Sequence, residues 1–480
     1  MVHHRDTVFF KLFVAAISAL SLLLMQAVAP AQRGRREQRR PNIIFILADD
    51  LGYGDLGSYG QKFFKTPNLD RMAQEGLRLT QFYSGSPVCA PSRASFMTGL
   101  HQGHAYIRGN MDVNNQRVSL RPEDVTIAEV LKRAGYRTGV IGKWGLGEPD
   151  TTGVPNRQGF DYWFGYLNQN LAHNYYPDYL WRNNERVTLP RGTYSHDLFT
   201  QEALDFIRRE RNGPFFLYLA YTIPHAHNEL TKKTGNGMEV PTDAPYSNQT
   251  WPQPEKNYAA MIARMDTDAG KILALLKELN LDDETIVMFS SDNGPQSKDE
   301  GGYEQSFFDS NGPFRGIKRE LYEGGVRVPL IVRWPGKIRA GQTTDYVAAQ
   351  WYLLPTMARM AGVRPPAGID GSSILPVLLG QRQTPDKYLY WEFHEGGFAQ
   401  AARLGRWKAV RHGADGPIEL YDLQTDVGET RDVAAQRPEL VRRMAAIMRR
   451  EHAESEHWPV SQLRQTRTPG QRRAPASVNN

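Results

Sequence analysis

The chain has 480 residues, of which 40% are hydrophobic and 23% are charged, a composition that is typical of a folded globular protein and excludes disorder along the whole length. Its formal net charge of +6 does not indicate a nucleic-acid partner, because the excess of basic residues is confined to residues 1–40 and 461–480. Residues 41–460 carry 47 Lys and Arg against 50 Asp and Glu, so this part of the chain is slightly acidic.

The N-terminal segment has basic residues ahead of an apolar run that ends in small residues. Ala29 and Ala31 offer an A-x-A cleavage pattern, so we predict a signal peptide over residues 1–31 and a basic linker over 32–40. The protein would then be exported, either to a periplasm or to the medium, with no stable membrane insertion after cleavage. A retained anchor is the alternative, because residues 8–28 approach the length of a membrane span.

From Pro41 onward, short apolar runs rich in β-branched residues alternate with amphipathic stretches. This alternation predicts an α/β fold with a large, mostly parallel sheet flanked by helices. The predicted strands are 42–48, 137–141, 215–221, 285–290 and 328–332, and the predicted helices between them include 126–133 and 258–279. The polar, proline-rich residues 229–255 are expected to form a long loop.

The composition changes again at residues 380–387, after which short strand-like segments follow. Residues 388–393, 407–411 and 419–422 predict a small antiparallel sheet, and residues 438–451 predict a helix. We therefore expect a large domain over residues 41–380, a small C-terminal subdomain over 381–460 and a disordered basic tail over 461–480.

Cys89 is the single cysteine of the chain, although exported proteins normally use cysteines in pairs. Pro91 is suited to a first helical turn, so Cys89 would lie at the N-terminus of a helix. Free N–H groups at that end, together with the charge of Arg93, favour an anion beside the thiol. A small buried hydrophobic residue is the alternative, but this context favours a nucleophile next to an anion site.

Two pairs of oxygen-bearing side chains follow predicted strands directly. Asp49 and Asp50 come after strand 42–48, and Asp292 and Asn293 come after strand 285–290. Ligands of open α/β sheets bind at the carboxyl ends of strands, so these pairs can meet. An all-oxygen set favours a hard cation, and irregular coordination favours calcium over magnesium. For the first pair the alternative is a carboxylate that caps the turn at residues 51–54, and for the second it is a simple turn at Asn293-Gly294.

The residues around Cys89 also carry a resemblance to a known family. Cys89-Ala90-Pro91-Ser92-Arg93 matches C-x-P-S-R, the motif by which a maturation enzyme recognises the cysteine that it converts to formylglycine. Further blocks lie in family order over most of residues 41–460: PNIIFILADDLGYGDLGSYG, TPNLDRMAQEG, CAPSRASFMTG, GYRTGVIGKWGLG, TIPHAH, SSDNG and GIKRELYEGGVRVPLIVRWPG. The chain therefore resembles the arylsulfatase type of the sulfatase family.

The resemblance implies an alkaline-phosphatase-like fold, a catalytic domain at residues 41–380 and a sulfated small-molecule or glycan substrate. It also implies a formylglycine formed from Cys89 by the maturation enzyme, and one calcium ion held by Asp49, Asp50, Asp292, Asn293 and position 89. In the implied mechanism, one hydroxyl of the hydrated formylglycine attacks sulfur and the alcohol leaves. The second hydroxyl then expels sulfate as the aldehyde re-forms.

Four further residues receive roles from the same blocks. Arg93 would orient position 89 and stabilise its alkoxide, while Lys143 and Lys318 would contact the sulfate group. His225 would interact with the ester oxygen and act as general acid. The natural ester is not specified by these blocks, and a sulfated carbohydrate is our preferred prediction.

The chain departs from the family pattern at Gly145, where G-K-W-H-L-G has a histidine that supports the formylglycine diol. His104 and His227 are candidates to replace it by sequence proximity alone. Two alternative functions stay open at this point. One is hydrolysis of a phosphate or phosphonate ester by the same fold. The other is a sulfated-glycan binding protein without catalysis, for which Gly145 is the supporting feature.

Overall fold

A computed structural model describes residues 40–386 and 388–460 of the protein. The predicted signal peptide, all of the predicted linker except Arg40, and the predicted tail lie outside the described residues. Among the residues that are described, no helix combines the length and the apolar character that crossing a bilayer requires.

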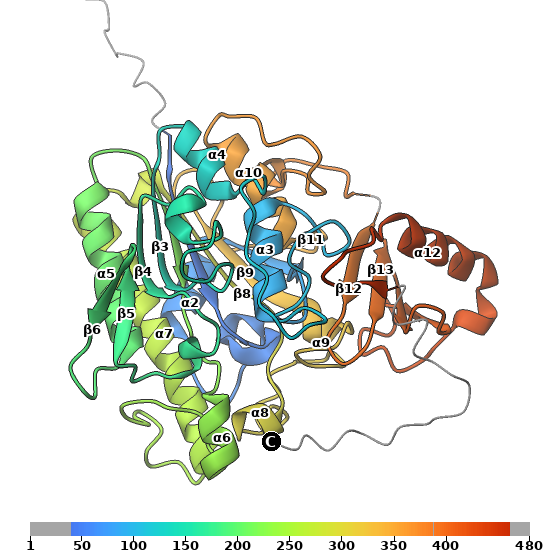
Figure 1. Ribbon diagram of the computed structural model, residues 1–480, viewed down its shortest axis with the longest axis horizontal. Coiled ribbons are helices and arrows are strands. Elements are labelled where there is room, and N and C mark those ends of the chain that lie inside the picture. Colours follow the sequence, from blue (N-terminus) through green and yellow to red (C-terminus); the bar gives the residue numbers. More distant parts are fainter. Residues whose placement is uncertain (1–39, 387, 461–480) are drawn as a thin grey trace, which may run out of the picture. The chain divides into compact units, whose positions relative to one another are not determined.

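A large sheet of eleven strands forms the centre of the described chain (Figure 1). Across the sheet the strands are β10 (Gln342–Thr344), β2 (Leu77–Tyr83), β9 (Arg327–Arg333), β8 (Thr285–Ser291), β1 (Asn42–Ala48), β7 (Phe215–Ala220), β3 (Arg137–Lys143), β4 (Tyr162–Tyr166), β5 (Tyr179–Arg182) and β6 (Glu185–Thr188), with β11 (Ala348–Ala349) paired to β2.

The middle of this sheet is parallel and its margins are mixed. β8, β1, β7, β3 and β4 pair in parallel, whereas β9 runs antiparallel to both β8 and β2. Every residue of β1, β7 and β8 is buried, as their continuous apolar runs predict for strands covered on both faces. The parallel order places the carboxyl ends of β8, β1, β7 and β3 along one edge of the sheet.

Helices cover both faces of the sheet because alternate residues of each strand point to opposite sides. The helices are α2 (Pro67–Gln74), α3 (Cys89–Thr98), α4 (Ile127–Arg133), α5 (Ser195–Glu210), α6 (Asn228–Thr234), α7 (Gln253–Glu278), α8 (Lys298–Gly301), α9 (Glu323–Val326), α10 (Leu353–Met360), α11 (Leu375–Leu378) and α12 (Pro438–Arg450). Ile43 and Phe45 of β1 belong to a core with α3, α4 and α10, whereas Ile44 and Ile46 belong to a core with α2, α5 and α7.

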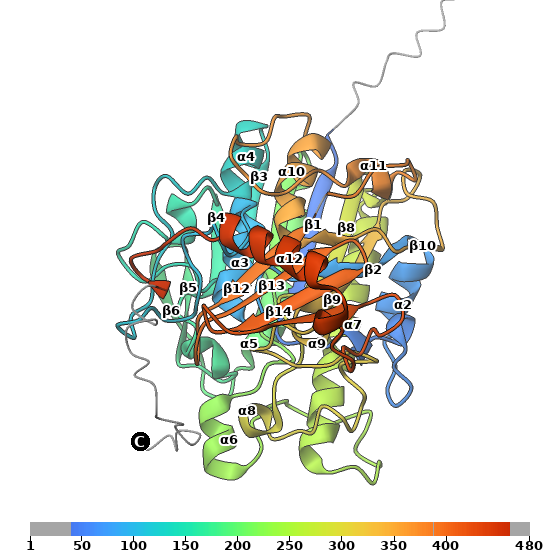
Figure 2. The same cartoon turned by 90° about the vertical axis from the view of Figure 1, so that its right-hand side faces the viewer.

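A second sheet follows the large one in the chain. Its four antiparallel strands are β12 (Leu389–Phe393), β13 (Ala399–Leu404), β14 (Trp407–His412) and β15 (Ile418–Asp422). Figure 2 shows α12 in front of these strands, and Met444, Ile447 and Met448 of the helix form a small core with the sheet. The predicted α/β class, with a large mostly parallel sheet and a small antiparallel sheet plus helix, is confirmed.

Two local predictions need correction. The stretch 229–255 was expected to be a loop, but α6 occupies its first part and α7 begins at Gln253, before the predicted start of that helix at 258. β13 was not predicted, because its sequence AQAARL has no β-branched or aromatic residue.

Candidate active site

The two predicted oxygen-bearing pairs lie side by side at the carboxyl edge of the large sheet. β1 and β8 are parallel neighbours in which Ala48 pairs with Ser291, so the residues that follow each strand emerge together. The backbone N–H of Asp50 donates to Oδ1 of Asp292 over 3.1 Å. Nδ2 of Asn293 donates to Oδ1 of Asp50 over 2.7 Å. Asp49, Asp50, Asp292 and Asn293 are all buried.

Cys89 is the first residue of α3 and faces these carboxylates. Its Sγ lies 3.3 Å from Oδ1 of Asp49 and 3.9 Å from Oδ1 of Asp50. Burial, and then the charge of Asp49, hold the pKa of the Cys89 thiol well above its usual range. An unmodified Cys89 is therefore a protonated thiol and a poor nucleophile.

Arg93 is fully buried one helical turn after Cys89. Its Nε and Nη2 donate to Oδ2 of Asp292 over 3.1 and 2.9 Å, and Nη1 donates to the carbonyl of Lys143 over 2.6 Å. Nη2 also lies 3.6 Å from Asp49. These contacts bind the guanidinium to the carboxylates behind the cysteine, so Arg93 fixes the geometry of Asp292 directly.

Two lysines each pair with one of the adjacent aspartates. Nζ of Lys143, the last residue of β3, donates to Oδ2 of Asp49 over 2.7 Å. Nζ of Lys318 donates to Oδ2 of Asp50 over 2.8 Å. Both lysines are buried, and both line the same cavity as Cys89.

His225 lies beyond the end of β7 and contacts Lys318. Its Nδ1 is 2.5 Å from the carbonyl oxygen of Ala226, and its Nε2 is 3.1 Å from Nζ of Lys318. A carbonyl accepts and an ammonium donates, so Nδ1 holds the proton and Nε2 accepts. Burial, and then Lys318, hold the pKa of His225 well below its usual range. The imidazole is therefore neutral in this arrangement.

Three carboxylates and three cations balance each other in this buried cluster. Burial would raise the pKa of Asp49, but the charge of Lys143, with those of Arg93 and Lys318, holds it below its usual range. Burial and the nearby charge of Asp49 raise the pKa of Asp292 to about 7.

The donor set fits a hard cation. Asp49, Asp50, Cys89 and His225 each offer an atom within 4.8 Å of the others. Oδ1 of Asn293 is buried and has no hydrogen-bond partner among the described residues, although Nδ2 of the same amide is bonded. A buried amide oxygen without a partner, beside three carboxylates, offers the oxygen ligands that a hard cation such as calcium takes.

The cluster opens into a cavity of about 590 Å³. Cys89, Lys143, His225 and Lys318 are among its most buried lining residues. The apolar side chains of its remaining wall are Met111, Val113 and Trp458, and the polar ones include Asn110, Asn115, Asn170 and Asn228. The charged ones are Asp112, Glu229, Asp299, Glu300, Glu395, Arg117, Lys232 and Arg319.

The nine residues predicted as catalytic or metal-binding all lie in this cluster, and two residues that were not predicted lie next to them. His173 stacks on His225 with ring centroids 4.6 Å apart, and its Nδ1 lies 3.4 Å from Glu229. Gln169 lines the cavity next to Gly145. The departure at Gly145 was the signal that could have prompted a search for a side chain in its place.

Neither histidine proposed to replace the missing side chain at 145 lines the cavity. Nδ1 of His104 is 2.8 Å from Asp370, and its ring stacks on His101. Nδ1 of His227 is 2.6 Å from Glu239.

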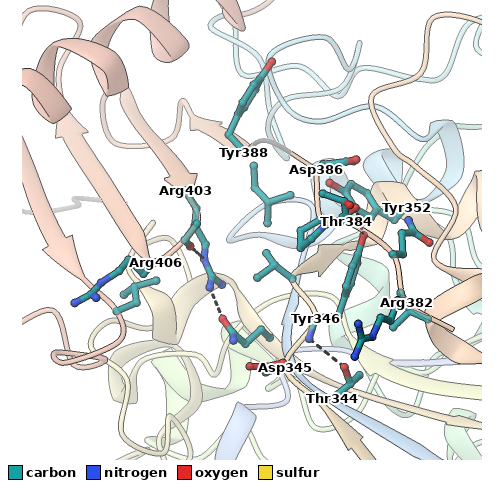
Figure 3. A pocket seen from close by; sticks show the side chains of 18 of the residues that line it. Thr344, Asp345, Tyr346, Tyr352, Arg382, Thr384, Asp386, Tyr388, Arg403 and Arg406 are labelled. Atoms are coloured by element: carbon teal, nitrogen blue, oxygen red, sulfur yellow. Dashed lines mark hydrogen bonds between the residues drawn. The ribbon is translucent and has the colours of Figure 1, made fainter. Parts of the chain in front are cut away.

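A larger cavity, of about 890 Å³, lies apart from this cluster (Figure 3). It is lined by the segment around Tyr346, by residues 381–386 and by Arg403 and Arg406 of the small sheet and its β13–β14 turn. Both arginines already have protein partners, Gln81 and Tyr83 for Arg403 and Asp422 for Arg406. None of the predicted site residues belongs to it.

Comparison with known proteins gives consistent matches. Residues 41–363 match the family described as Sulfatase, and residues 311–454 match the one described as N-sulphoglucosamine sulphohydrolase, C-terminal. N-acetylgalactosamine-6-sulfatase of Rattus norvegicus is 35% identical over 428 residues, covering 83% of this chain and 75% of the relative. Steryl-sulfatase of Homo sapiens is 31% identical over 433 residues, covering 72% of this chain and 71% of the relative. The crystal structure of Ps i-CgsB in complex with k-i-k-neocarrahexaose is similar with a TM-score of 0.76 and 29% identity, covering 88% of this chain and 96% of that one.

Proposed function

The chain belongs to the sulfatase family and is a sulfuric ester hydrolase, and from this premise we propose that it removes sulfate from a carbohydrate with a formylglycine nucleophile formed from Cys89. The observation that carries the proposal is the position of this cysteine. It is buried at the start of α3 against Asp49 and Asp50, where the thiol itself stays protonated. Oxidation to the aldehyde by the maturation enzyme, followed by addition of water, gives a diol whose hydroxyl is the nucleophile, so attack does not depend on a thiolate.

The proposed reaction runs through position 89 in two steps. Water adds to the aldehyde to give a diol, and one hydroxyl of the diol attacks sulfur while the S–O bond to the sugar breaks. The attacking hydroxyl loses its proton in this step and the leaving sugar oxygen takes one, so no proton is gained or lost overall. The second hydroxyl then loses its proton, the C–O bond to the sulfate group breaks, and the aldehyde re-forms as inorganic sulfate leaves.

The cations of the cavity would hold the sulfate group in these steps. Lys143 and Lys318 line the cavity beside Cys89, and each can donate to a sulfuryl oxygen while it keeps its contact with an aspartate. His225 accepts from Lys318 through Nε2 and lines the same cavity, so the two side chains can interact with the leaving oxygen, and the Lys318 ammonium is the member of the pair that carries the proton. Arg93 would act indirectly, because its guanidinium donates to Asp292 and holds that carboxylate in place.

Calcium would be held by Asp49, Asp50, Asp292, Asn293 and the oxidised side chain at position 89. When bound, calcium would neutralise negative charge on the nucleophile and on the sulfuryl oxygens. The unsatisfied Oδ1 of Asn293 and the raised pKa of Asp292 support this assignment.

The cavity wall favours a sugar over a steroid or a simple aryl ester. Its amide and carboxylate side chains suit a substrate rich in hydroxyl groups, whereas three apolar side chains, Met111, Val113 and Trp458, offer little surface to a steroid. The relative named N-acetylgalactosamine-6-sulfatase and the structure solved with k-i-k-neocarrahexaose support the same class. We also propose that the protein is exported, and that a formylglycine-generating enzyme converts Cys89 during maturation.

The test combines modification, metal content and turnover. The chain is produced with and without a formylglycine-generating enzyme, and the peptide containing position 89 is weighed by mass spectrometry. Turnover is then measured on defined sulfated saccharides, an aryl sulfate, a steroid sulfate and a phosphate ester. We expect aldehyde at position 89, calcium bound in a one-to-one ratio, and fastest turnover on a saccharide.

Two variants sharpen this test. Cys89→Ala should lose turnover, and Asn293→Ala should lose bound calcium. Near-native turnover in Cys89→Ala, or preference for the phosphate ester, would contradict the proposal.

A further inference from the structure

The space beside Gly145 is filled by a side chain from another element. Gly145 lies two residues after β3, and its φ is +75°. A Cβ at this position would lie 2.8 Å from Cδ of Gln169 and closer still to its Nε2. Gln169 stands in the turn after β4, the parallel neighbour of β3. Its carboxamide therefore occupies the place where a side chain at position 145 would begin.

This carboxamide is not satisfied by the protein. Gln169 is 5% exposed, and its Nε2 has no hydrogen-bond partner among the described residues. A buried donor without an acceptor is unfavourable, because it has lost its hydrogen bond to water and gained none in return. Such a group calls for a partner from outside the folded chain.

The surroundings identify the kind of partner. Gln169 lines the same cavity as Cys89, Lys143 and Lys318. Both lysines are paired with aspartates, whereas the amide donor of Gln169 is uncommitted. The groups expected in that space during the reaction, the sulfate ester and the diol at position 89, present oxygen acceptors.

We propose that Gln169 is a catalytic residue whose Nε2 donates a hydrogen bond to an oxygen of the reacting centre, either a sulfuryl oxygen or the hydroxyl that replaces the thiol at position 89. This inference rests on the proposed hydrolysis of a sulfate ester. In this arrangement Gln169, which follows the neighbouring strand β4, supplies the hydrogen-bond donor that Gly145 lacks. An amide does not titrate, so this donor is present at every pH at which the protein folds.

Three substitutions at Gln169 test the role. Gln169→Met keeps the approximate shape without the donor, and kcat should fall at least about 10-fold, since loss of one preorganised donor typically costs about 100- to 1,000-fold. Thermal stability should not fall, because an unsatisfied buried amide is removed. Gln169→Glu places a negative charge beside an anionic centre and should reduce kcat further. Gln169→His introduces a titratable donor, so the pH profile of kcat should gain an ionisation near about 6.5.

Gln158 provides the matched control. It is also buried, but its Nε2 donates to the carbonyls of Arg121 and Thr152, and it does not line the cavity. Gln158→Met should lower thermal stability and leave kcat unchanged. Gln169→Met should thus lower kcat without lowering stability, and Gln158→Met should do the reverse. The comparison distinguishes loss of a catalytic donor from damage to the fold.

Two binding measurements distinguish the acceptors. Inorganic sulfate is titrated calorimetrically into Cys89→Ala with and without Gln169→Met, and binding at least 10-fold weaker in the double variant identifies a sulfuryl oxygen. Equal sulfate binding, with faster trapping of the aldehyde by hydroxylamine in Gln169→Met, identifies the hydroxyl at position 89.

The outcomes keep this inference separate from the proposed function. A parent protein that desulfates no ester contradicts the proposed function, while the sulfate titration still decides whether Gln169 binds the anion. The inference is overturned if Gln169→Met keeps kcat within about two-fold of the parent, or if sulfate affinity and aldehyde trapping are both unchanged.

Discussion

Gly145 combines a left-handed backbone with a close neighbour, and both constraints can be tested by adding one methyl group. A φ of +75° is costly for a residue with a Cβ, and that Cβ would collide with the Gln169 carboxamide. We expect Gly145→Ala to lose about 1–2 kcal/mol of the free energy of unfolding. We also expect kcat to fall, because Gln169 is displaced. Denaturant titration and steady-state kinetics measure the two effects.

Gly362 is the control for this substitution. Its φ is +72°, but a Cβ there would meet nothing within 4 Å. Gly362→Ala should therefore lose stability without loss of kcat. A Gly145→Ala enzyme with unchanged kcat would show that the position of Gln169 does not matter to turnover.

The site residues differ in how far the sequence could predict them. Cys89 stands in the C-x-P-S-R motif and the aspartates directly follow apolar strands, so a linear pattern was enough to select them. Gln169 is brought to Gly145 by the pairing of β3 with β4, across 24 residues of chain and without a motif of its own. Contacts of this kind depend on strand register, which the sequence alone does not give.

The segment that connects β1 to α2 contains a buried acid with an unusual ionisation. Oδ2 of Asp55 accepts from the backbone N–H of Gly52 over 2.7 Å and from the hydroxyl of Tyr258 in α7 over 2.6 Å. Oδ1 has no hydrogen-bond partner among the described residues. Burial raises the pKa of this carboxyl from 3.8 to about 7.

Asp55 should therefore make stability depend on pH. Between pH 3.8 and about 7 the unfolded chain has lost this proton while the folded protein keeps it, so rising pH reduces the free energy of unfolding. Over this whole pH range the free energy of unfolding should fall by about 4 kcal/mol. Asp55→Asn removes this ionisation, and its stability relative to the parent should rise from pH 4 to pH 7 in denaturant titrations. A constant difference across this range would contradict the assignment.

Among the elements, those with strong periodic patterns were predicted and those that depend on tertiary context were not. The apolar runs of β1, β7 and β8 identify buried strands, and helix α4 begins after Thr126 with a complete capping box, as its sequence indicates. The antiparallel direction of β9 has no local signal, because an apolar run looks the same in either direction. β13 is a strand because β12 and β14 pair with it on both sides.

At the scale of the whole molecule, the small sheet is joined to the large one by a buried ion cluster. Nζ of Lys408 in β14 lies 2.9 Å from Glu323 of α9 and 3.3 Å from Glu429. Glu323 also accepts from the hydroxyl of Tyr83 in β2 over 2.7 Å. Although burial opposes it, Lys408 and Arg327 lower the pKa of Glu323 to about 2.

Removal of Lys408 should leave the buried Glu429 without the counter-ion that Lys408 provides, and Glu323 with its ion pair to Arg327 alone. We expect Lys408→Met to reduce the free energy of unfolding by about 3–5 kcal/mol, the usual result of breaking a buried ion pair on one side. Lys271 pairs with Asp268 at 2.7 Å but has a half-exposed side chain, so Lys271→Met should cost less than about 1 kcal/mol. Denaturant titration of both variants compares them directly. Equal losses would mean that Lys408 does not link the two sheets.

The charges around the cavity mouth also determine how substrate reaches the buried lysines. Outside the catalytic cluster the wall carries three cations, Arg117, Lys232 and Arg319, against five carboxylates. Such a mouth creates no attractive long-range field for an anion, so diffusional encounter proceeds without electrostatic steering. For a monosulfated saccharide, kcat/KM should change less than about two-fold between 0.02 and 0.3 M salt, whereas a steered encounter would slow steeply over that range. We therefore predict that a densely sulfated chain is turned over with a lower kcat/KM than a saccharide that carries an isolated sulfate group.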